Sequence, residues 1–267
     1  MLFANSQGVR RFQTAIETCH LTNRVSILSE STIRLSRFAP SAQELPTGTS
    51  PWLAQTPIEK RYPSLKGEQH TEIAIIGGGV IGLLLMDKLA RKGHTVALLD
   101  ASKIAASNTN QMGGLVTRAL DPMFTDLKRG LGTKSVKKLA GISRRGQLEI
   151  QTLARQISSS MYCNQQSFFV SYQRHDPTLR GEWNVLKTID NNLQFVSGRK
   201  ARAILPHVRE AVVFDKEGTL DIRRFLNGLL EQFRSTTNVQ IFEDSKVETI
   251  ETVGSKVYVR TPEGVVV

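Results

Sequence analysis

The stretch Thr71–Asp100, TEIAIIGGGVIGLLLMDKLARKGHTVALLD, decides the fold of this chain. It predicts a strand over residues 73–76, a glycine turn, a helix that begins near Val80, and a second strand over residues 95–99. The first strand is short and continuously apolar, as expected of a parallel strand buried on both faces. The helix has a broad apolar face and closes at Lys92 and Gly93. Such a strand–turn–helix–strand unit predicts a Rossmann-like α/β domain that binds a dinucleotide.

The turn has the spacing G-x-G-x-x-G over Gly77-Gly78-Gly79-Val80-Ile81-Gly82. The first glycine allows a tight turn, the second lets the backbone approach a pyrophosphate, and the third lets helix and strand pack closely. The helix amino terminus offers free N–H groups and a partial positive charge to the phosphates. A plain glycine-rich turn is the alternative, but the complete surrounding unit favours the dinucleotide site. The predicted cofactor contacts in the turn are Gly77, Gly78, Gly79, Ile81 and Gly82.

An acidic residue ends the second predicted strand. Asp100, followed by Ala101, lies about twenty residues beyond the glycines, where an acid accepts hydrogen bonds from the adenosine ribose. Its negative charge disfavours a 2′-phosphate on that ribose. We therefore expect Asp100 and Ala101 at the ribose end of the cofactor site.

A small, polar loop follows at residues 101–117, ASKIAASNTNQMGGLVT. Backbone amides and hydroxyls in such a loop can lie along the rest of a bound cofactor. The loop contains Ser107 and leads into Gly113, Gly114 and Leu115. A surface loop with a turn at Gly113-Gly114 is the equally open alternative.

Residues 1–70 differ from the rest and predict an irregular amino-terminal extension. Prolines are frequent, and Trp52 and Tyr62 are expected to anchor an extended arm on the body. The first 40 residues are rich in arginine and contain few acids, which partly matches a transit peptide. We expect a cytoplasmic protein, with a mitochondrial location as the alternative.

The remainder of the chain alternates between predicted helices and strands. A long helical segment is expected over residues 121–160, interrupted near Gly130–Gly132 and Gly141, and a further helix begins at Pro177. A turn is expected at Gly218–Asp221, before a strongly amphipathic helix over residues 222–233 with Asp221 as N-cap. Residues 198–205 predict a short helix, and the expected strands are residues 167–172, 193–196, 211–214, 239–242, 247–250, 257–260 and 263–267.

Composition argues for a soluble globular protein without a membrane span. The 267 residues are 40% hydrophobic and 22% charged, and no apolar run approaches the roughly 20 residues of a span. The net charge is +11, but the basic residues occur in pairs and not in long runs, and no nucleic-acid-binding motif is present. Basic residues on solvated helix faces therefore explain the charge better than a nucleic-acid partner does. The two cysteines and five histidines match no metal-binding spacing, and no hydrolase or P-loop motif is present.

Taken together, these segments resemble the FAD-dependent oxidoreductases of the D-amino-acid oxidase type, which include glycine oxidase, sarcosine oxidase and the γ-glutamylputrescine oxidoreductases. The resemblance runs from about Trp52 to the last residue and rests on the glycine unit, the loop ending in Gly113-Gly114-Leu115, ARAILPHV (201–208) and EGTLDIRRFLNGLLEQF (217–233). It implies FAD as cofactor and oxidation of the C–N bond of a small-molecule amine or amino acid. It also implies that the backbone of Val247 meets the adenine, and that Ser107 and the Gly113-Gly114 backbone, followed by Leu115, line the loop beside the flavin. The family loop commonly reads S-G-R-N-G-G, whereas Ser107–Gly114 is longer and contains no arginine.

The resemblance implies a Rossmann-like FAD-binding domain with an inserted, incomplete α+β substrate domain. The expected boundaries are 1–70 for the extension, 71–160 and 217–267 for the two parts of the FAD-binding domain, and 161–216 for the substrate segment. In the family the chain continues beyond a strand such as residues 263–267, so we expect a carboxyl-terminal part to be missing. We predict no catalytic residue. The alternatives are a non-catalytic FAD-binding remnant or subunit that needs a partner chain, and an NAD-dependent dehydrogenase.

Overall fold

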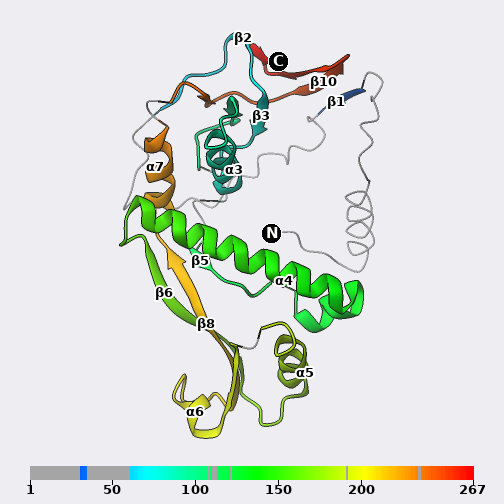
Figure 1. The fold of residues 1–267 in the computed structure, drawn as a ribbon, viewed down its shortest axis with the longest axis vertical. Helices are drawn as coiled ribbons and strands as arrows, with labels where there is room; N and C mark the ends of the chain where they lie inside the picture. Colours follow the sequence, from blue (N-terminus) through cyan, green and yellow to red (C-terminus); the bar gives the residue numbers. More distant parts are fainter. Residues whose placement is uncertain are drawn as a thin grey trace, which may run out of the picture. The chain divides into compact units, whose positions relative to one another are not determined.

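The computed structural model describes residues 61–106, 109, 113–120, 122–190, 192–233 and 236–267, and the backbone of the strand Ser31–Arg34. The chain divides into two compact units (Figure 1). The described residues of the first lie in Thr117–Leu148 and Gln165–Glu217, and those of the second lie in Leu28–Val116, Glu149–Asn164 and Gly218–Val267. Each unit is described by itself below.

The second unit is built on a three-stranded parallel sheet. Its order is β3 (Ile73–Ile76), β4 (Val96–Leu99) and β9 (Val239–Phe242). β4 lies in the middle and is buried along its whole length, as its continuous apolar sequence predicts. β3 was expected to be buried on both faces, and this is wrong at its end, because β3 is the outer strand and Ile76 is 47% exposed.

A largely apolar helix and an amphipathic helix pack against each other in this unit. α3 (Val80–Ala90) and α7 (Ile222–Gln232) contribute Leu83, Met86 and Phe225 to one core cluster with the side chains of β3 and β4. Each large apolar side chain buried in this way stabilises the fold by about 1.5–3 kcal/mol. Asp221 caps α7, as predicted, by accepting a hydrogen bond from the Arg224 N–H at 3.1 Å.

A five-stranded sheet completes the second unit, in the order β1 (Ser31–Arg34), β10 (Thr249–Val253), β11 (Lys256–Arg260), β12 (Gly264–Val266) and β2 (Gly67–Gln69). β10 and β11 correspond to the strands expected at 247–250 and 257–260, with β10 shifted to later residues, and they pair antiparallel; β12 runs parallel to β2. β1 and β2 are strands within the region that was expected to be irregular. They form because their pairing partners lie near the other end of the chain, which local sequence patterns do not reveal.

The arm that precedes β2 packs on the body through Tyr62 and Leu65. The backbone N–H of Tyr62 donates to Glu243 Oε2 at 3.1 Å, and that of Leu65 donates to Ser245 Oγ at 2.8 Å. The predicted anchoring role of Tyr62 is therefore confirmed. Trp52 lies outside the described residues.

A third sheet has the order β5 (Leu115–Val116), β8 (Glu210–Leu220) and β6 (Tyr162–Ser171), and β7 (Gln194–Ser197) also pairs with β8. β8 continues to Leu220, so the turn predicted at Gly218–Asp221 is wrong. Gly218 serves close packing instead of a turn, because a Cβ there would lie 2.2 Å from the ring of Tyr162.

The first unit contains α5 (Pro177–Leu186), α6 (Gly198–Arg202) and most of α4 (Phe124–Ile157). α4 is interrupted at Gly132, which has φ +75° and ψ 162°, as predicted, but it continues through Gly141, where a second interruption was expected. The core of this unit gathers side chains from α4, α5 and the strands around Phe124, Val136, Leu179, Leu186 and Phe214.

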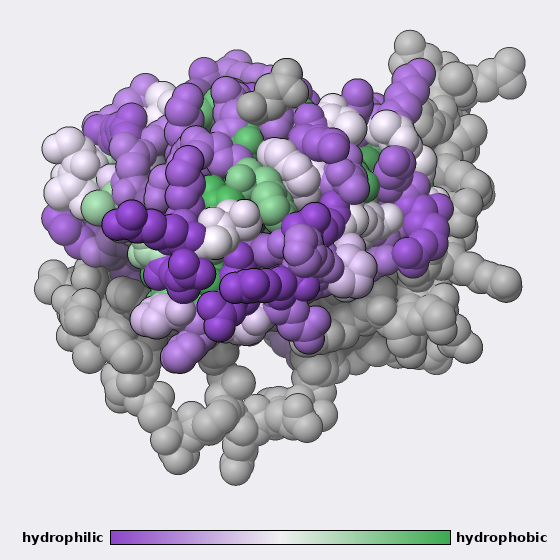
Figure 2. All heavy atoms as spheres, turned by 90° about the horizontal axis from the view of Figure 1, so that it is seen from below, coloured by the Kyte–Doolittle hydropathy of each residue, from purple (hydrophilic) through white to green (hydrophobic). Residues whose placement is uncertain are grey.

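The described surface is largely polar. Figure 2 shows one face of the molecule, on which hydrophilic residues predominate and hydrophobic residues form smaller areas between them. Within the described ranges, no helix combines the length and the apolar character needed to cross a lipid bilayer.

Candidate cofactor site

The predicted glycine turn lies between the end of β3 and the start of α3. Gly77 has φ +106°, a backbone conformation that favours glycine, and its N–H donates to the Leu99 carbonyl of the neighbouring strand at 2.8 Å. At Gly82 the helix lies very close to the Gly77 backbone, because a Cβ on Gly82 would be 1.9 Å from the Gly77 carbonyl oxygen. Both residues therefore hold the turn in a shape that other residues would disrupt.

The carboxylate of Asp100 lies directly at this turn. Its Oδ2 accepts a hydrogen bond from the Gly78 N–H at 2.7 Å, and its Oδ1 accepts one from the Ser102 N–H at 2.8 Å. The Asp100 backbone is also fixed, since its N–H donates to the Phe242 carbonyl at 2.9 Å. An ionised carboxylate has about four acceptor positions, so the group keeps capacity for a further donor. The structure thus brings together the turn and the acid that the sequence predicted.

The amino terminus of α3 keeps part of its hydrogen-bonding capacity. The N–H groups of Gly79 and Ile81 donate to no described residue, whereas the Val80 N–H donates to Thr109 Oγ1 at 3.2 Å. The Ile81 side chain is 80% exposed and leaves its backbone accessible. Free N–H groups at a helix start fit the oxygens of a pyrophosphate. The N–H donors of the turn therefore fit the pyrophosphate of a dinucleotide.

Thr109 is a site residue that sequence reasoning missed. Its side chain is almost fully buried, and its hydroxyl lies 3.3 Å from where a Cβ on Gly79 would be. Within a small, polar loop nothing marked this threonine as different from its neighbours. Only its position against the helix terminus reveals that it contacts the turn.

The second predicted glycine pair is held by a different part of the unit. Gly114 has φ +67°, its carbonyl accepts a hydrogen bond from the Leu220 N–H at 2.7 Å, and a Cβ on it would lie 2.2 Å from the Leu220 carbonyl oxygen. Leu115 pairs with Thr219 across β5 and β8, and its side chain is largely exposed. No hydrogen bond among the described residues joins this pair to the first turn. Ser107 lies outside the described residues.

Val247 lies close behind the Asp100 loop. Its side chain is buried in a cluster with Leu99 and Phe242, and two residues earlier the Ser245 N–H donates to the Asp100 carbonyl at 2.8 Å. The backbone N–H of Val247 donates to no described residue. Ala101, next to Asp100, is exposed. The residues predicted for the adenosine end of the cofactor are thus neighbours in space.

Glu243 is the second residue that sequence reasoning did not assign. Its buried carboxylate accepts hydrogen bonds from the Ile104 N–H at 2.9 Å and the Tyr62 N–H at 3.1 Å. It therefore fixes the loop after Asp100 against the arm. The only signal in the sequence was an acid at the end of a predicted strand, which is also common on protein surfaces.

The fold and the turn define a dinucleotide-binding α/β protein. Residues 72–267 match the FAD dependent oxidoreductase (DAO) family, and the chain belongs to this family. The cofactor of the family is FAD, so the nicotinamide alternative is not supported.

Individual relatives agree with this assignment. A curated protein of Rhizobium meliloti (strain 1021), "Probable oxidoreductase OrdL", is 22% identical over 232 residues, which cover 82% of this chain and 52% of the relative. The crystal structure of glycine oxidase from Bacillus cereus ATCC 14579 has a TM-score of 0.54 at 22% identity, covering 73% of this chain and 52% of that chain. L-Amino acid deaminase from Proteus myxofaciens has a TM-score of 0.55 at 18% identity, covering 76% of this chain and 45% of that chain.

The structural similarities at these identities establish the fold. The chain spans about half the length of the first curated relative and of these solved chains.

Proposed function

We propose that this chain forms the FAD-binding part of an oxidoreductase that oxidises the C–N bond of an amine or amino acid. The observation that carries the proposal is the contact between Asp100 and the glycine turn, with N–H groups at the start of α3 left available. Family membership supports FAD as the cofactor. The fold shared with a glycine oxidase and an amino acid deaminase supports a nitrogenous substrate.

The residues of the turn hold the phosphates in this proposal. The N–H groups of Gly79 and Ile81 would donate to pyrophosphate oxygens, and Gly77, Gly78 and Gly82 would keep the backbone close enough for that contact. The partial positive charge at the start of α3 would favour the negative charge of the pyrophosphate. The Thr109 hydroxyl, already at the helix terminus, orients the turn.

Asp100 and its neighbours hold the adenosine. The Asp100 carboxylate would accept hydrogen bonds from the ribose hydroxyls, with Ala101 beside them. The backbone N–H of Val247, which donates to no described residue, would be available to the adenine. Ser107, Gly113, Gly114 and Leu115 line the flavin side of the cofactor in the proposal. Backbone groups would make most of these contacts, so recognition of the cofactor would depend mainly on the shape of the backbone and less on charged side chains.

Bound FAD would supply the redox chemistry: its flavin would take the hydride from the carbon attached to the substrate nitrogen, the nitrogen would lose its proton, and water would hydrolyse the imine to a carbonyl compound and an amine or ammonia. The residues of this chain orient the cofactor and shield it from solvent, and none of them is assigned a catalytic role. The proposed FAD-binding parts are residues 71–160 and 217–267, and the proposed substrate-binding segment is 161–216. A cytoplasmic location is part of the proposal, with a mitochondrial one as the alternative; the two cysteines in 267 residues fit a reducing compartment.

A second candidate function is an FAD-binding subunit that becomes active only with a partner polypeptide. It is favoured by the exposed edge of β3 in the nucleotide-binding sheet, which lacks a pairing partner among the described residues. The two candidates share the cofactor site and differ in whether this chain alone turns over substrate.

The test is to purify the chain, record its visible spectrum, and measure oxygen uptake with a panel of amino acids and N-methyl amino acids. We expect bound oxidised flavin in the unmodified protein and its loss in Gly79→Val, whose side chain blocks the approach of the pyrophosphate. Gly146→Val is the matched control, because a Cβ there meets no atom within 4 Å. A colourless protein, or equal flavin in Gly79→Val and the control, contradicts the site. Flavin without turnover supports the second candidate.

A further inference from the structure

The core of the first unit leaves a small pocket beside α4, which is called the α4 pocket below. Its volume is about 130 Å³, and all the residues that line it belong to the first unit. Four of its apolar side chains are buried members of that core: Phe124, Leu186, Leu193 and Phe214. A cavity of about 150 Å³ lined by such side chains holds a benzene molecule, so the α4 pocket has room for an apolar group of about five or six carbon atoms.

One face of α4 forms a wall of the α4 pocket. The lining residues on this wall are Lys137, Ala140, Gly141 and Arg144. Residues three, four and seven positions apart lie on the same face of a helix, and the two cations are separated by about 10 Å along its axis. The two small residues between them leave space over the helix. A Cβ on Gly141 would have one neighbour within 4 Å, the Arg145 guanidinium at 3.6 Å, so this position has room for a larger side chain.

The charged groups at the α4 pocket differ in whether they are paired. Arg118 and Asp190 also line it, and Asp190 Oδ2 accepts from Arg118 Nη1 at 2.6 Å, while Glu217 Oε1 accepts from Arg118 Nε at 2.8 Å. Lys137 and Arg144 are exposed, and neither side chain forms a hydrogen bond or an ion pair with a described residue. Ammonium and guanidinium groups carry donors and no acceptor. The two cations of α4 are therefore available to an anion.

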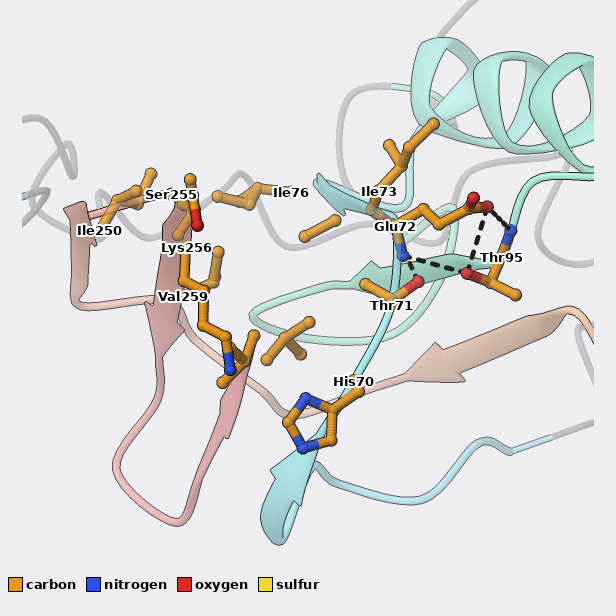
Figure 3. Close-up of a pocket in the computed structure, with 14 residues that line it drawn as sticks. His70, Thr71, Glu72, Ile73, Ile76, Thr95, Ile250, Ser255, Lys256 and Val259 are labelled. Atoms are coloured by element: carbon orange, nitrogen blue, oxygen red, sulfur yellow. Dashed lines mark hydrogen bonds between the residues drawn. The ribbon is translucent and has the colours of Figure 1, made fainter. Parts of the chain in front are cut away.

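A larger pocket in the second unit lacks this combination. It has a volume of about 760 Å³ and lies between β3 and the β10–β11 pair (Figure 3). Two of its polar residues bind each other, since Glu72 Oε2 accepts from the Thr95 N–H at 2.7 Å and the Glu72 N–H donates to Thr95 Oγ1 at 3.0 Å. Lys256 is the one lysine or arginine among the described residues that line it, whereas the α4 pocket has three such residues. The α4 pocket is therefore the stronger candidate for binding an anionic molecule.

We propose that the α4 pocket binds a small amphipathic carboxylate of about six carbon atoms. The hydrocarbon part fills the space between the core side chains, and the carboxylate lies between Lys137 and Arg144. An arginine can bind a carboxylate through two parallel hydrogen bonds, and the lysine adds a second positive charge. None of the residues predicted to bind the cofactor lines the pocket. The proposal therefore goes beyond the proposed function and does not depend on FAD binding.

The test compares three six-carbon probes that differ only in their head groups. Hexanoate, hexan-1-ol and hexylamine are titrated into the purified chain at low ionic strength, and isothermal titration calorimetry measures each Kd. We expect hexanoate to bind about ten-fold more tightly than hexan-1-ol, because the two cations attract its charge, and hexylamine to bind more weakly than both. A neutral apolar molecule is the competing occupant. No binding of hexanoate, or equal affinity for hexanoate and hexan-1-ol, overturns the proposal.

Charge variants locate the head group. The double variant Lys137→Gln with Arg144→Gln should bind hexanoate about ten-fold more weakly than the unmodified chain and hexan-1-ol equally well. Its matched control is Lys138→Gln with Arg145→Gln, which removes the same charge from the same helix one residue further on, at positions that do not line the pocket. The control should keep the hexanoate affinity to within about two-fold. Equal losses in the two double variants would show that only the net charge of α4 matters, and they overturn the proposal.

A filled pocket locates the hydrocarbon part. Gly141→Leu places a large side chain at the wall of the pocket and should abolish binding of both hexanoate and hexan-1-ol. Gly146→Leu adds the same side chain to the same helix outside the pocket, where a Cβ meets no atom within 4 Å, and it should bind like the unmodified chain. Circular dichroism checks that both variants are folded. Hexanoate binding that persists in a folded Gly141→Leu protein overturns the proposal. Should Gly141→Leu fail to fold, the double variant of the exposed Lys137 and Arg144 still decides.

Discussion

The glycine turn and the charged cluster around Arg118 differ in how many of their hydrogen-bond donors have an acceptor among the described residues. At the turn, the N–H groups of Gly79 and Ile81 remain without a described partner. In the first unit, Arg118 is surrounded by acceptors: its Nε donates to Glu217 Oε1 at 2.8 Å and its Nη1 to Asp190 Oδ2 at 2.6 Å. Its Nη2 donates to the Asp215 carbonyl. Charge by itself therefore does not mark a functional site, and unused hydrogen-bonding capacity is the better indicator.

The same contrast appears at other acids of the first unit. The buried carboxylate of Glu182 accepts hydrogen bonds from the N–H groups of Phe124 at 2.7 Å and Thr125 at 2.9 Å, at the start of α4. An anion at a helix start is stabilising, and here the protein supplies its own. The start of α3 has no acidic residue in its first turn, and Gly79 provides no side-chain cap. The start of α4 is therefore capped by a buried carboxylate, whereas at the start of α3 the Thr109 hydroxyl accepts from the Val80 N–H and the Gly79 and Ile81 N–H groups have no described acceptor.

The largest expected loss of stability comes from removing an acceptor from the hydrogen-bonded cluster around Arg118. Glu217→Ala removes the partner of the Arg118 Nε and leaves a buried cation with fewer acceptors, so it should lower the free energy of unfolding by about 3–5 kcal/mol. Urea unfolding measures this. Asp126→Ala is the control, because Asp126 and Arg129 form an exposed ion pair at 3.1 Å, and its loss should cost less than about 1 kcal/mol. Equal losses in the two variants would show that the Arg118 cluster is not a structural centre.

The next largest effect is expected from adding a Cβ at Gly82, where helix α3 lies close to the backbone of the turn. Gly82→Ala places a Cβ 1.9 Å from the Gly77 carbonyl oxygen, a backbone atom that cannot move away cheaply. We expect a loss of about 2 kcal/mol in the free energy of unfolding, together with loss of bound FAD. Gly146→Ala, in the open interior of α4, should instead stabilise the protein by up to about 1 kcal/mol. A Gly82→Ala protein that keeps its flavin would contradict the close packing of helix and strand.

The first strand–turn–helix–strand unit could be predicted from the sequence because its determinants are local. The expected strands and helix agree with β3, α3 and β4 to within about two residues at their ends. The glycine spacing also correctly placed Asp100 at the turn, since the length of the unit sets that distance. The interruption of α4 at Gly132 was equally visible.

The parts that could not be predicted depend on partners far away in the chain. The exposure of Ile76 follows from the absence of a described strand beyond β3, which no pattern within residues 73–76 reveals. Thr109 and Glu243 are ordinary residues until folding brings them to the Val80 and Ile104 N–H groups. Gly218 suggested a turn, because the ring of Tyr162 that requires a glycine there is 56 residues earlier. Local chemistry predicts elements, whereas tertiary contacts decide their edges and their site residues.

A smaller effect separates the charge of Asp100 from its geometry. In Asp100→Asn the single side-chain oxygen can accept from only one of the Gly78 and Ser102 N–H groups, so the free energy of unfolding should fall by about 1 kcal/mol. FAD affinity, measured by fluorescence titration, should fall roughly ten-fold, because a hydroxyl binds a charged acceptor more strongly than a neutral one. Asp244→Asn is the control: Asp244 is exposed and pairs with Lys103, and its loss should leave FAD affinity unchanged. An unchanged affinity in Asp100→Asn would remove Asp100 from the ribose site.

The smallest expected effect is a pH dependence confined to the first unit. The hydrogen bond from the Arg180 guanidinium lowers the pKa of Glu210 below its ordinary value, and a further hydrogen bond from the His175 N–H at 3.0 Å acts in the same direction. A carboxyl whose pKa is lower in the folded than in the unfolded protein stabilises the fold above its unfolded pKa, near 4.3. That contribution is lost as the pH falls through the folded pKa. Arg180→Gln should therefore be less stable than the unmodified chain at pH 7, and the difference in urea midpoint should disappear towards pH 3. Because Glu210 and Arg180 lie in the first unit, FAD affinity at pH 7 should be the same in both proteins.

A stability difference that persists at pH 3 would mean that Arg180 acts through packing against Phe195 and not through the ion pair. The Arg180 guanidinium lies over the Phe195 ring, at 5.7 Å from its centroid.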